Sequence, residues 1–288
     1  MTDVRSTDRL SDAAVADVLA LATAAEQADG VYPLSEDTVF LVRGGNGAQL
    51  LASDGGTLVG YAGGGELVVH PAHRRRGHAT ALLGALGDGP LAFWAHGDLA
   101  PATSFAEKTG FKRARVLWQM RRSLTDFSAA SVVPEGVTLR HFRPGRDEEG
   151  WLAVNSRAFA HHPEQGGWTR SDLELREAEP WFDPAGFLLA VDISDKLLGF
   201  HWTKVHPAAG RDPALGEIYV LGVDPGGHRR GLGVALSVAG LRHLADSGLT
   251  QALLYVDESN TAAVALYRKL GFEIYQSDVN YQRGSSPS

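Results

Sequence analysis

An internal repeat is the feature of this sequence that most restricts its fold. Residues 66–79 and 220–233 share one pattern: an apolar strand, a Pro, and a basic loop that contains Gly. Pro71 matches Pro225 and Gly77 matches Gly231 at the same separation, and a second match, Lys-x-Gly-Phe, follows in both copies. A repeat of about 150 residues indicates a duplicated domain, because solenoid repeats run about 20 to 50 residues.

The 288 residues are enough for two such domains, and their boundary is predicted from a stretch without periodicity. Residues 123–136 contain Ser, Asp, Pro and Gly without sustained apolar spacing, which is typical of a linker. Residues 137–142 then alternate like a first strand. We therefore expect an α/β protein with an N-terminal domain at 1–126 and a C-terminal domain at 137–288.

Each copy is expected to begin with a helix and several strands. A strand, a loop and a second helix follow, and a further strand and a last helix end the copy. Apolar spacing predicts helices at 11–27 and 231–245. Short apolar runs predict strands at 188–191, 198–202 and 253–256. A last helix is predicted at 260–270, with Asn260 capping its start and Gly271 its end.

Composition excludes several classes of protein. A net charge of −7 leaves no basic excess for nucleic acid, and the absence of Cys excludes disulfides, thiolate metal sites and a Cys nucleophile. The histidines, His161 and His162 among them, have no Glu or Cys companion at a ligand spacing, so no metal is expected. Residues 1–10 lack the apolar core of a signal peptide, and no uncharged apolar run approaches about 20 residues. We expect a cytoplasmic protein.

The strongest chemical signal is a strand followed by a basic loop and a helix, in both copies. The unpaired N–H groups and positive dipole end of a helix N-terminus bind phosphate oxygens, and Gly lets the backbone approach them. A single copy could equally be a solvated basic turn. Two copies in matching context favour a pyrophosphate site, such as one for coenzyme A. The loop is not a P-loop, because Gly-Lys-Ser/Thr is absent, and the order of its glycines differs from that of the dinucleotide fingerprint.

This motif resembles the acetyl-CoA motif of the GNAT superfamily of N-acetyltransferases, Arg/Gln-x-x-Gly-x-Gly/Ala after a strand. Residues 74–79 fit it fully, whereas His228 departs from it at the first position of 228–233. The resemblance implies two tandem GNAT domains, each a mixed, mostly antiparallel twisted sheet flanked by helices. It also implies that two neighbouring strands diverge at a bulge, where the pantetheine arm enters.

Acetyl-CoA is thus the implied co-substrate, with contacts in both copies. In the first copy the implied contacts are Leu67, Val68, Val69, Arg75, Arg76, Gly77, His78, Ala79 and Thr80. In the second copy they are Leu221, Gly222, Val223, His228, Arg229, Arg230, Gly231, Leu232, Gly233, Val234, Asn260, Thr261, Ala262, Ala263, Val264 and Ala265.

Longer strings resemble one branch of that superfamily, the mycothiol synthases, at residues 93–97, 162–169, 199–207, 216–225 and 254–256. That family transfers acetyl from acetyl-CoA to the cysteinyl amine of Cys-GlcN-Ins (desacetylmycothiol), the last step of mycothiol biosynthesis. The resemblance implies a monomer with a small-molecule substrate and with no nucleic-acid or membrane partner. It points to five substrate contacts and, through the first of them, to a cleft between the domains: Glu36, Glu164, Lys204, Glu217 and Tyr255.

Two residues of the second copy are candidates for the chemistry, which needs a base for the ammonium and an acid for the leaving thiolate. Glu217 lies in an otherwise apolar strand, where a carboxylate needs a partner or a purpose; the alternative is an edge carboxylate in solvent. Strict alternation places Tyr219 and Leu221 on its face. The superfamily resemblance implies that Tyr267 is the acid, although helical periodicity alone would make it a core residue. Strand amides between Leu221 and Val223 are expected to stabilise the oxyanion.

The first copy lacks both groups. Gly63 aligns with Glu217 and Ala106 with Tyr267, while Glu66 aligns with Val220 and is expected on the other face of its strand. The first copy is therefore expected to bind acetyl-CoA without turning it over. Two alternatives stay open for the whole chain: a GNAT enzyme that acetylates another small-molecule or peptide amine, and a non-catalytic acyl-CoA sensor.

Overall fold

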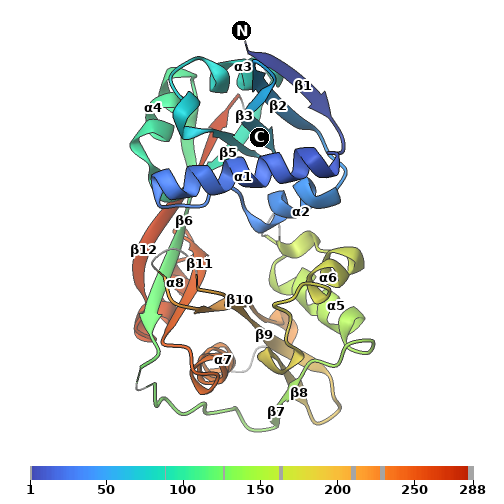
Figure 1. Ribbon diagram of the computed structural model, residues 1–288. Coiled ribbons are helices and arrows are strands. Elements are labelled where there is room, and N and C mark those ends of the chain that lie inside the picture. Colours follow the sequence, from blue (N-terminus) through green and yellow to red (C-terminus); the bar gives the residue numbers. More distant parts are fainter. Residues whose placement is uncertain are drawn as a thin grey trace. The chain divides into compact units, whose positions relative to one another are not determined.

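The computed structural model describes residues 2–87, 89–125, 127–161, 165–208, 212–227 and 231–284. The chain divides into two compact units (Figure 1). Unit 1 comprises Met1–Trp118, Asp257–Ser259 and Gln276–Ser288, and unit 2 comprises Gln119–Val256 and Asn260–Tyr275. Two long strands, β6 (Lys112–Ser123) and β12 (Glu273–Arg283), contribute residues to both units.

Unit 1 is a sheet with helices on both faces. Its other elements are β1 (Asp3–Thr7), α1 (Asp12–Asp29), α2 (Glu36–Gly44), β2 (Gln49–Asp54), β3 (Thr57–Gly63), β4 (Glu66–Val69), α3 (His78–Ala85), β5 (Leu91–Ala95) and α4 (Ala100–Lys108). The strands lie in the order β1-β2-β3-β4-β5-β12, and only the β4–β5 pair is parallel. Alternate residues serve opposite faces: Tyr61 and Val68 pack on α1, whereas Ala62 and Leu67 pack on Leu82 of α3.

Unit 2 repeats this plan. Its elements are β7 (Val137–His141), α5 (Glu148–Ala158), α6 (Arg170–Glu177), β8 (Phe187–Asp192), β9 (Leu197–His206), β10 (Leu215–Val223), α7 (Leu232–Asp246), β11 (Gln251–Asp257) and α8 (Thr261–Lys269). The strand order is β11-β10-β9-β8-β7, with only β10 and β11 parallel. Trp202 packs with Trp151 of α5 on one face, and Leu198 packs with Leu236 of α7 on the other. The predicted mixed, mostly antiparallel sheet flanked by helices is confirmed.

The predicted local elements are also confirmed, because their end signals are strong. Ser11 caps α1 by accepting the Ala14 N–H at 3.4 Å, and Asn260 caps α8 by accepting the Ala263 N–H at 3.1 Å. Gly271 follows α8 with φ of 83°, a left-handed conformation that Gly adopts without strain. Between β6 and β7 the described residues form neither helix nor strand, as expected of the stretch 123–136.

The compact units differ from the predicted domains 1–126 and 137–288 at the end of the chain. Residues Val279 to Arg283 of β12 pair antiparallel with β5, so the last described strand belongs partly to unit 1. Val279 and Tyr281 are buried there with Phe111. Local periodicity does not encode which distant strand a segment pairs with. The division of the chain into two homologous domains at those boundaries stays a prediction.

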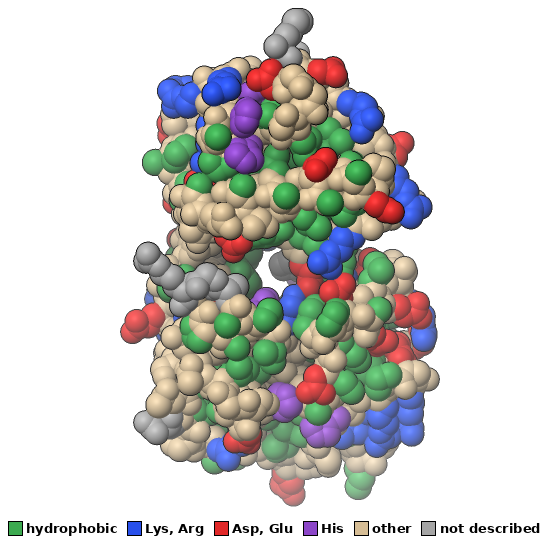
Figure 2. Space-filling model, viewed as in Figure 1, with side chains coloured by type: hydrophobic (Ala, Val, Ile, Leu, Met, Phe, Trp, Pro, Cys, Tyr) green, Lys and Arg blue, Asp and Glu red, His purple; other side chains and the backbone are tan. Residues whose placement is uncertain are grey.

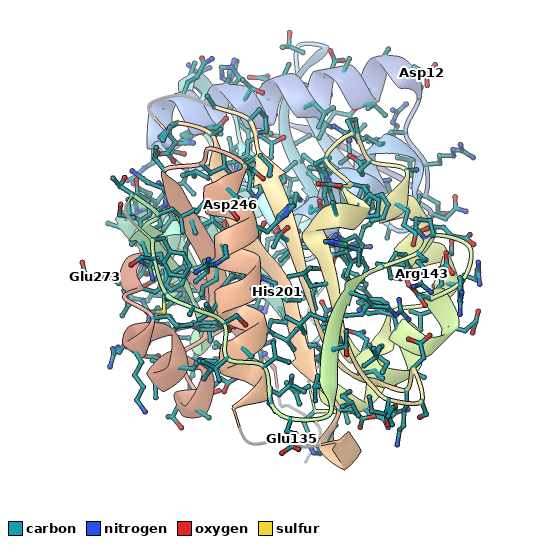
Figure 3. The ribbon with its side chains drawn as sticks, turned by 90° about the horizontal axis from the view of Figure 1, so that it is seen from below. Asp12, Glu135, Arg143, His201, Asp246 and Glu273 are labelled. Atoms are coloured by element: carbon teal, nitrogen blue, oxygen red, sulfur yellow. The ribbon has the colours of Figure 1, made fainter. Side chains whose placement is uncertain are left out.

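Close packing of α7 on β9 depends on one glycine. His201 of β9 is fully buried, and its Nδ1 lies 2.8 Å from the Leu236 carbonyl oxygen (Figure 3). A Cβ on Gly240 would overlap the imidazole ring. Burial lowers the pKa of His201 to about 4, so the ring is neutral beneath the helix.

The surface carries both signs of charge. On the face that Figure 2 shows, basic and acidic side chains are interspersed, and histidines appear on both the upper and the lower part of the view. Within the described ranges, no helix has the length and apolar character needed to cross a membrane.

Candidate active site

In unit 2, β10 and β11 pair over a short stretch only. Their parallel register joins Gly216–Ile218 to Ala252–Leu254. A bulge then shifts the register of β10 on β9 between Ile218 and Val220. Because a bulge bends and twists its strand, it turns the rest of β10 away from β11. This is the divergence expected of the family fold.

The bulge also changes which side chains share a face with Glu217. Val220 pairs with Trp202, and Leu221 pairs with His201. Side chains alternate along β9, so Val220 shares the Glu217 face and Leu221 points to the α7 side, where it joins the cluster around α7. The expectation that Leu221 lies on the face of Glu217 is therefore wrong.

Glu217 is a buried carboxylate with polar partners on its own face. It is 6% exposed, which overturns the alternative of an edge carboxylate in solvent. Lys204 lies opposite on β9, and the Nε2 of His206 is 2.6 Å from Glu217 Oε2. The Lys204 Nζ is 4.4 Å from the centre of the Trp181 ring and 5.0 Å from that of Tyr219. Tyr219 thus stays on the face of Glu217, as expected.

Tyr267 is a buried phenol on α8. Its ring meets Phe272 edge-on at 5.9 Å between centroids. Burial raises the pKa of Tyr267 to about 12, so the hydroxyl keeps its proton at neutral pH. The structure therefore gives Tyr267 the core position that periodicity indicates, and its role as acid stays a prediction.

The remaining predicted contacts of the second copy fall at the ends of these elements. Leu221, Gly222 and Val223 end β10. Gly231, with φ of 87°, precedes α7, whose first turn contains Leu232, Gly233 and Val234. Thr261, Ala262, Ala263, Val264 and Ala265 begin α8. Four predicted residues lie outside the described part of the chain: Glu164, His228, Arg229 and Arg230.

The predicted substrate contacts are distributed over both units. Lys204, Glu217 and Tyr255 belong to unit 2, whereas Glu36 is the first residue of α2 in unit 1. Tyr255 is 43% exposed on β11, and its hydroxyl accepts a hydrogen bond from the Gln119 amide at 2.7 Å. A substrate cleft between the predicted domains stays a prediction.

Unit 1 contains a cavity of about 500 Å³ beside its basic loop. The register of β4 with β5 joins only Glu66 to Trp94, so this pair of strands diverges as well. Arg76 is exposed and is absent from the lining, whereas the other predicted contacts of the first copy line the cavity: Leu67, Val68, Val69, Arg75, Gly77, His78, Ala79 and Thr80.

The basic loop of unit 1 is shaped by one of its own arginines. Arg74 makes a bidentate pair with Asp29 at 2.7 and 2.6 Å. Gly77, with φ of 88°, starts α3 without a side-chain cap. The first N–H groups of α3 therefore have no capping side chain to compete with an anion. Arg75 lies at the cavity in a left-handed backbone conformation, with φ of 63°.

Glu66 of the first copy lies on the face that corresponds to Glu217. Val68, two residues further along β4, packs on α1, just as Val220 packs on the α5 side of unit 2. Glu66 aligns with Val220 in the repeat, and the bulge places Val220 on the same face as Glu217. Glu66 and Glu217 therefore lie on equivalent faces of their two sheets. The expectation that Glu66 points to the other face is wrong, and the bulge is the reason.

Glu66 nevertheless belongs to a cluster of charged side chains, in which both its oxygens accept hydrogen bonds. It is 1% exposed, and both its oxygens accept the Ser35 N–H, at 3.0 and 2.9 Å. The His96 ring bridges Glu66 and Asp278, with Nε2 2.8 Å from one carboxylate and Nδ1 2.9 Å from the other. Burial alone lowers the pKa of His96, but its hydrogen bonds to Asp278 and Glu66 and their charges raise it to about 10. The ring is an imidazolium that holds Glu66.

Comparisons with known proteins place this geometry in a family. Residues 152–272 match the family model "Acetyltransferase (GNAT) family". A mycothiol acetyltransferase from Thermomonospora curvata is 54% identical, with 96% of this chain and 95% of the relative covered. One from Salinispora arenicola is 53% identical, with 97% and 96% covered. The chain belongs to the mycothiol acetyltransferase family. It is an acetyl-CoA-dependent N-acetyltransferase of the GNAT type.

Solved structures show the same fold as this acetyltransferase. A tandem GNAT protein from the clavulanic acid biosynthesis pathway has a TM-score of 0.71 and 22% identity, with 100% of each chain covered. An N-acetyltransferase from Sphaerobacter thermophilus has a TM-score of 0.68 and 24% identity, with 100% of this chain and 96% of that one covered. The predicted tandem GNAT fold is confirmed.

Sequence reasoning gave no role to two histidines, His96 and His206, although both lie in strings that resemble the family. His206 follows Lys204 by two positions in one strand, so alternation places both on one face, and this signal could have found it. His96, Glu66 and Asp278 come from separate parts of the chain, so no local sequence pattern predicts that they form a cluster.

Proposed function

We propose that this acetyltransferase transfers acetyl from acetyl-CoA to the cysteinyl amine of Cys-GlcN-Ins and that unit 2 carries out the chemistry. The observation that carries the proposal is Glu217, a buried carboxylate just before the bulge where β10 leaves β11. The names of relatives that are 53–54% identical over nearly the full chain support the choice of acceptor.

Glu217 acts as the base for the substrate ammonium, directly or through one water. An amine attacks a thioester only after it has lost its proton. The hydrogen bond from His206 fixes the orientation of the carboxylate. The His206 side chain is 36% exposed, so water can reach the edge of this pair and carry the accepted proton away. Lys204, across the strand pair, presents an ammonium to the hydroxyl groups of the substrate.

Backbone and Tyr267 complete the transfer. Beyond the bulge, strand amides between Leu221 and Val223 donate to the thioester oxygen as negative charge develops on it. Tyr267, protonated at neutral pH, donates its proton to the leaving thiolate. Because the chain contains no Cys, the acetyl group passes directly to the amine rather than through a cysteine thioester.

Acetyl-CoA binds both copies in this proposal but reacts in one. In the second copy, acetyl-CoA contacts the turn at Gly231 and the start of α8. In the first copy, acetyl-CoA occupies the 500 Å³ cavity. The first copy does not turn it over, because Gly63 and Ala106 stand in place of base and acid and Glu66 is bound by His96. The protein works as a cytoplasmic monomer, without nucleic-acid or membrane partners.

Coenzyme A release with Cys-GlcN-Ins as acceptor tests the proposal. We expect Glu217→Gln to lower kcat by about 100-fold or more, because the ammonium keeps its proton. Glu273→Gln removes an exposed carboxylate of the same unit and should leave the rate unchanged. If the wild type binds acetyl-CoA without acetylating Cys-GlcN-Ins, the acceptor is wrong. If Glu217→Gln keeps the full rate, the base is wrong.

A further inference from the structure

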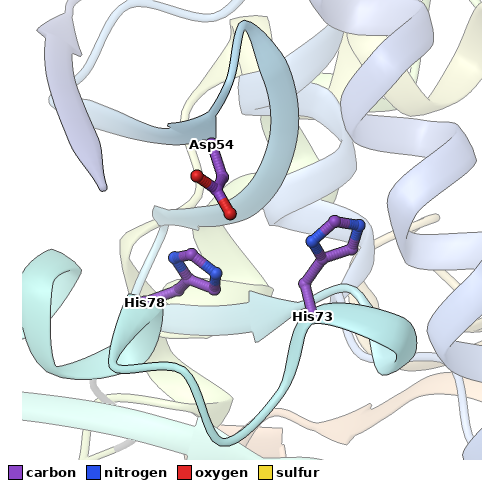
Figure 4. Close-up of side chains that lie close together, drawn as sticks. All are labelled: Asp54, His73 and His78. Carbon is purple, nitrogen blue, oxygen red and sulfur yellow. The ribbon is translucent and has the colours of Figure 1, made fainter. Parts of the chain in front are cut away.

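Unit 1 contains a cluster of metal-ligating side chains that takes no part in the chemistry of unit 2, although two of its members, His73 and His78, also line the cavity of the first copy. It consists of Asp54, His73 and His78, whose potential ligand atoms all lie within 4.8 Å of one another (Figure 4). Asp54 ends β2, His73 ends the short 3-10 helix η1 (Pro71–His73), and His78 begins α3. All three belong to unit 1, so the cluster is complete within one compact body.

The surroundings of His78 suit a metal ligand. His78 is 3% exposed, and its Nδ1 lies 2.9 Å from the Thr2 hydroxyl oxygen. Metal-ligating histidines commonly donate their other ring N–H to an oxygen, which fixes the tautomer and the ring orientation. In the tautomer that donates Nδ1–H to Thr2, Nε2 carries a lone pair.

Two buried ring nitrogens of the cluster lack hydrogen-bond partners. Within the described ranges, neither His78 Nε2 nor His73 Nδ1 has one. Buried polar atoms are nearly always satisfied, so an exception needs an explanation. A bound cation that accepts both lone pairs supplies one, and the Asp54 carboxylate adds the negative charge that such a cation favours.

We propose that Asp54, His73 and His78 bind one Zn²⁺ ion. Two imidazoles and one carboxylate suit a borderline divalent cation, whereas Ca²⁺ and Mg²⁺ prefer oxygen ligands. Zn²⁺ bonds of about 2.0 to 2.2 Å would draw the ligand atoms closer together than they now lie. The Asp54 side chain is half-buried at the end of β2, and a change in its χ angles can make that adjustment. Water completes the coordination.

The ion would cross-link the basic loop of the first copy. His73 and His78 flank residues 74–77, and through the ion Asp54 would connect both ends of that loop to the β2–β3 turn. Arg75 lines the cavity from within this loop. The ion would therefore hold the phosphate-binding loop in one conformation, a consequence that rests on the proposed acetyl-CoA site of the first copy.

Sequence spacing alone does not indicate this cluster, because Asp54 is distant from the two histidines along the chain. Only the antiparallel pairing of β2, β3 and β4 brings the end of β2 towards the loop after β4. The histidines that the sequence singled out are not part of it: His161 is exposed, and His162 lies outside the described residues.

Zn²⁺ titration of the chelator-treated full chain, in competition with a chromophoric chelator, tests the site. We expect the wild type to bind one equivalent that Asp54→Asn and His73→Gln bind at least tenfold more weakly. His141→Gln removes an exposed histidine from unit 2 and should bind like the wild type. Equal binding by the wild type and both variants, or no binding by the wild type, would overturn the proposal.

Thermal unfolding guards against a variant that merely fails to fold. Zn²⁺ that binds only the folded state should raise the Tm of the wild type and of His141→Gln but not that of Asp54→Asn or His73→Gln. The metal-free Tm of each variant shows whether it is folded. Because Zn²⁺ alone is the probe, failure of this site leaves acetyl transfer by unit 2 untouched, so the two proposals fail separately.

Discussion

Glu217 and Glu66 are both buried carboxylates beside a histidine, yet their chemical prospects differ. Glu217 has a part-exposed partner, His206, and lies just before the point where its strand leaves β11. Glu66 accepts a backbone N–H with both oxygens and faces an imidazolium that Asp278 also holds. A carboxylate whose lone pairs are occupied and whose charge is compensated is a poor base. At the residue scale, the two copies differ in the hydrogen-bond and charge partners of this carboxylate, not in the presence of a buried Glu.

At this scale we predict that Tyr267→Phe slows the chemical step and leaves acetyl-CoA binding intact. Loss of a general acid typically costs about 100-fold or more in kcat, and removing one buried hydroxyl changes little of the packing against Phe272. Single-turnover CoA release should show the loss, whereas the Kd for acetyl-CoA should not. Tyr275→Phe, an exposed phenol of unit 2, is the matched control. Equal single-turnover rates for Tyr267→Phe and wild type would remove the acid role.

At the scale of elements, the sequence predicts what is local. Helix α8 was predictable because Asn260 and Gly271 mark its ends, and β9 because apolar residues surround a turn. The bulge in β10 was not predictable from the sequence. One extra residue barely changes the composition of a strand, yet it reverses which face each later side chain occupies. The pairing of β12 with β5 was not predictable either, because it joins segments far apart in the chain. The sequence therefore identified Glu217 as a candidate base, but it placed Leu221 on the wrong face of the strand.

The packing of α7 on β9 leads to a prediction about two helical glycines. Gly240→Ala would drive a Cβ into the buried His201 ring, and overpacking of this kind costs about 1 to 3 kcal/mol. Gly150 of α5 has open space around it, so Gly150→Ala should stabilise the fold by about 0.5 to 1 kcal/mol through helix propensity. Urea unfolding midpoints should thus move in opposite directions. A Gly240→Ala midpoint at or above that of wild type would contradict the packing.

At the scale of the whole molecule, two histidines with shifted pKa values set opposite pH limits on stability. His201 has a lowered pKa, so the unfolded chain binds more protons below about pH 6.5, and stability is lost as pH falls towards 4. His96 has a raised pKa, so the folded chain holds an extra proton above about pH 6.5, and stability is lost as pH rises towards 10. One histidine is buried under a helix without a charged partner, and the other lies between two carboxylates.

The last prediction isolates the alkaline limit. In His96→Gln the extra proton of the folded state is absent, so the fall in stability between about pH 6.5 and 10, up to about 1.4 kcal/mol per pH unit for one proton, should disappear. The variant should be far less stable than wild type at pH 6, where the imidazolium is fully present, and the difference should shrink by pH 9.5. Urea midpoints across this range measure it, with His141→Gln as the exposed control. A difference that stays constant with pH would mean that the ring is neutral in the fold and that Glu66 and Asp278 are compensated in another way.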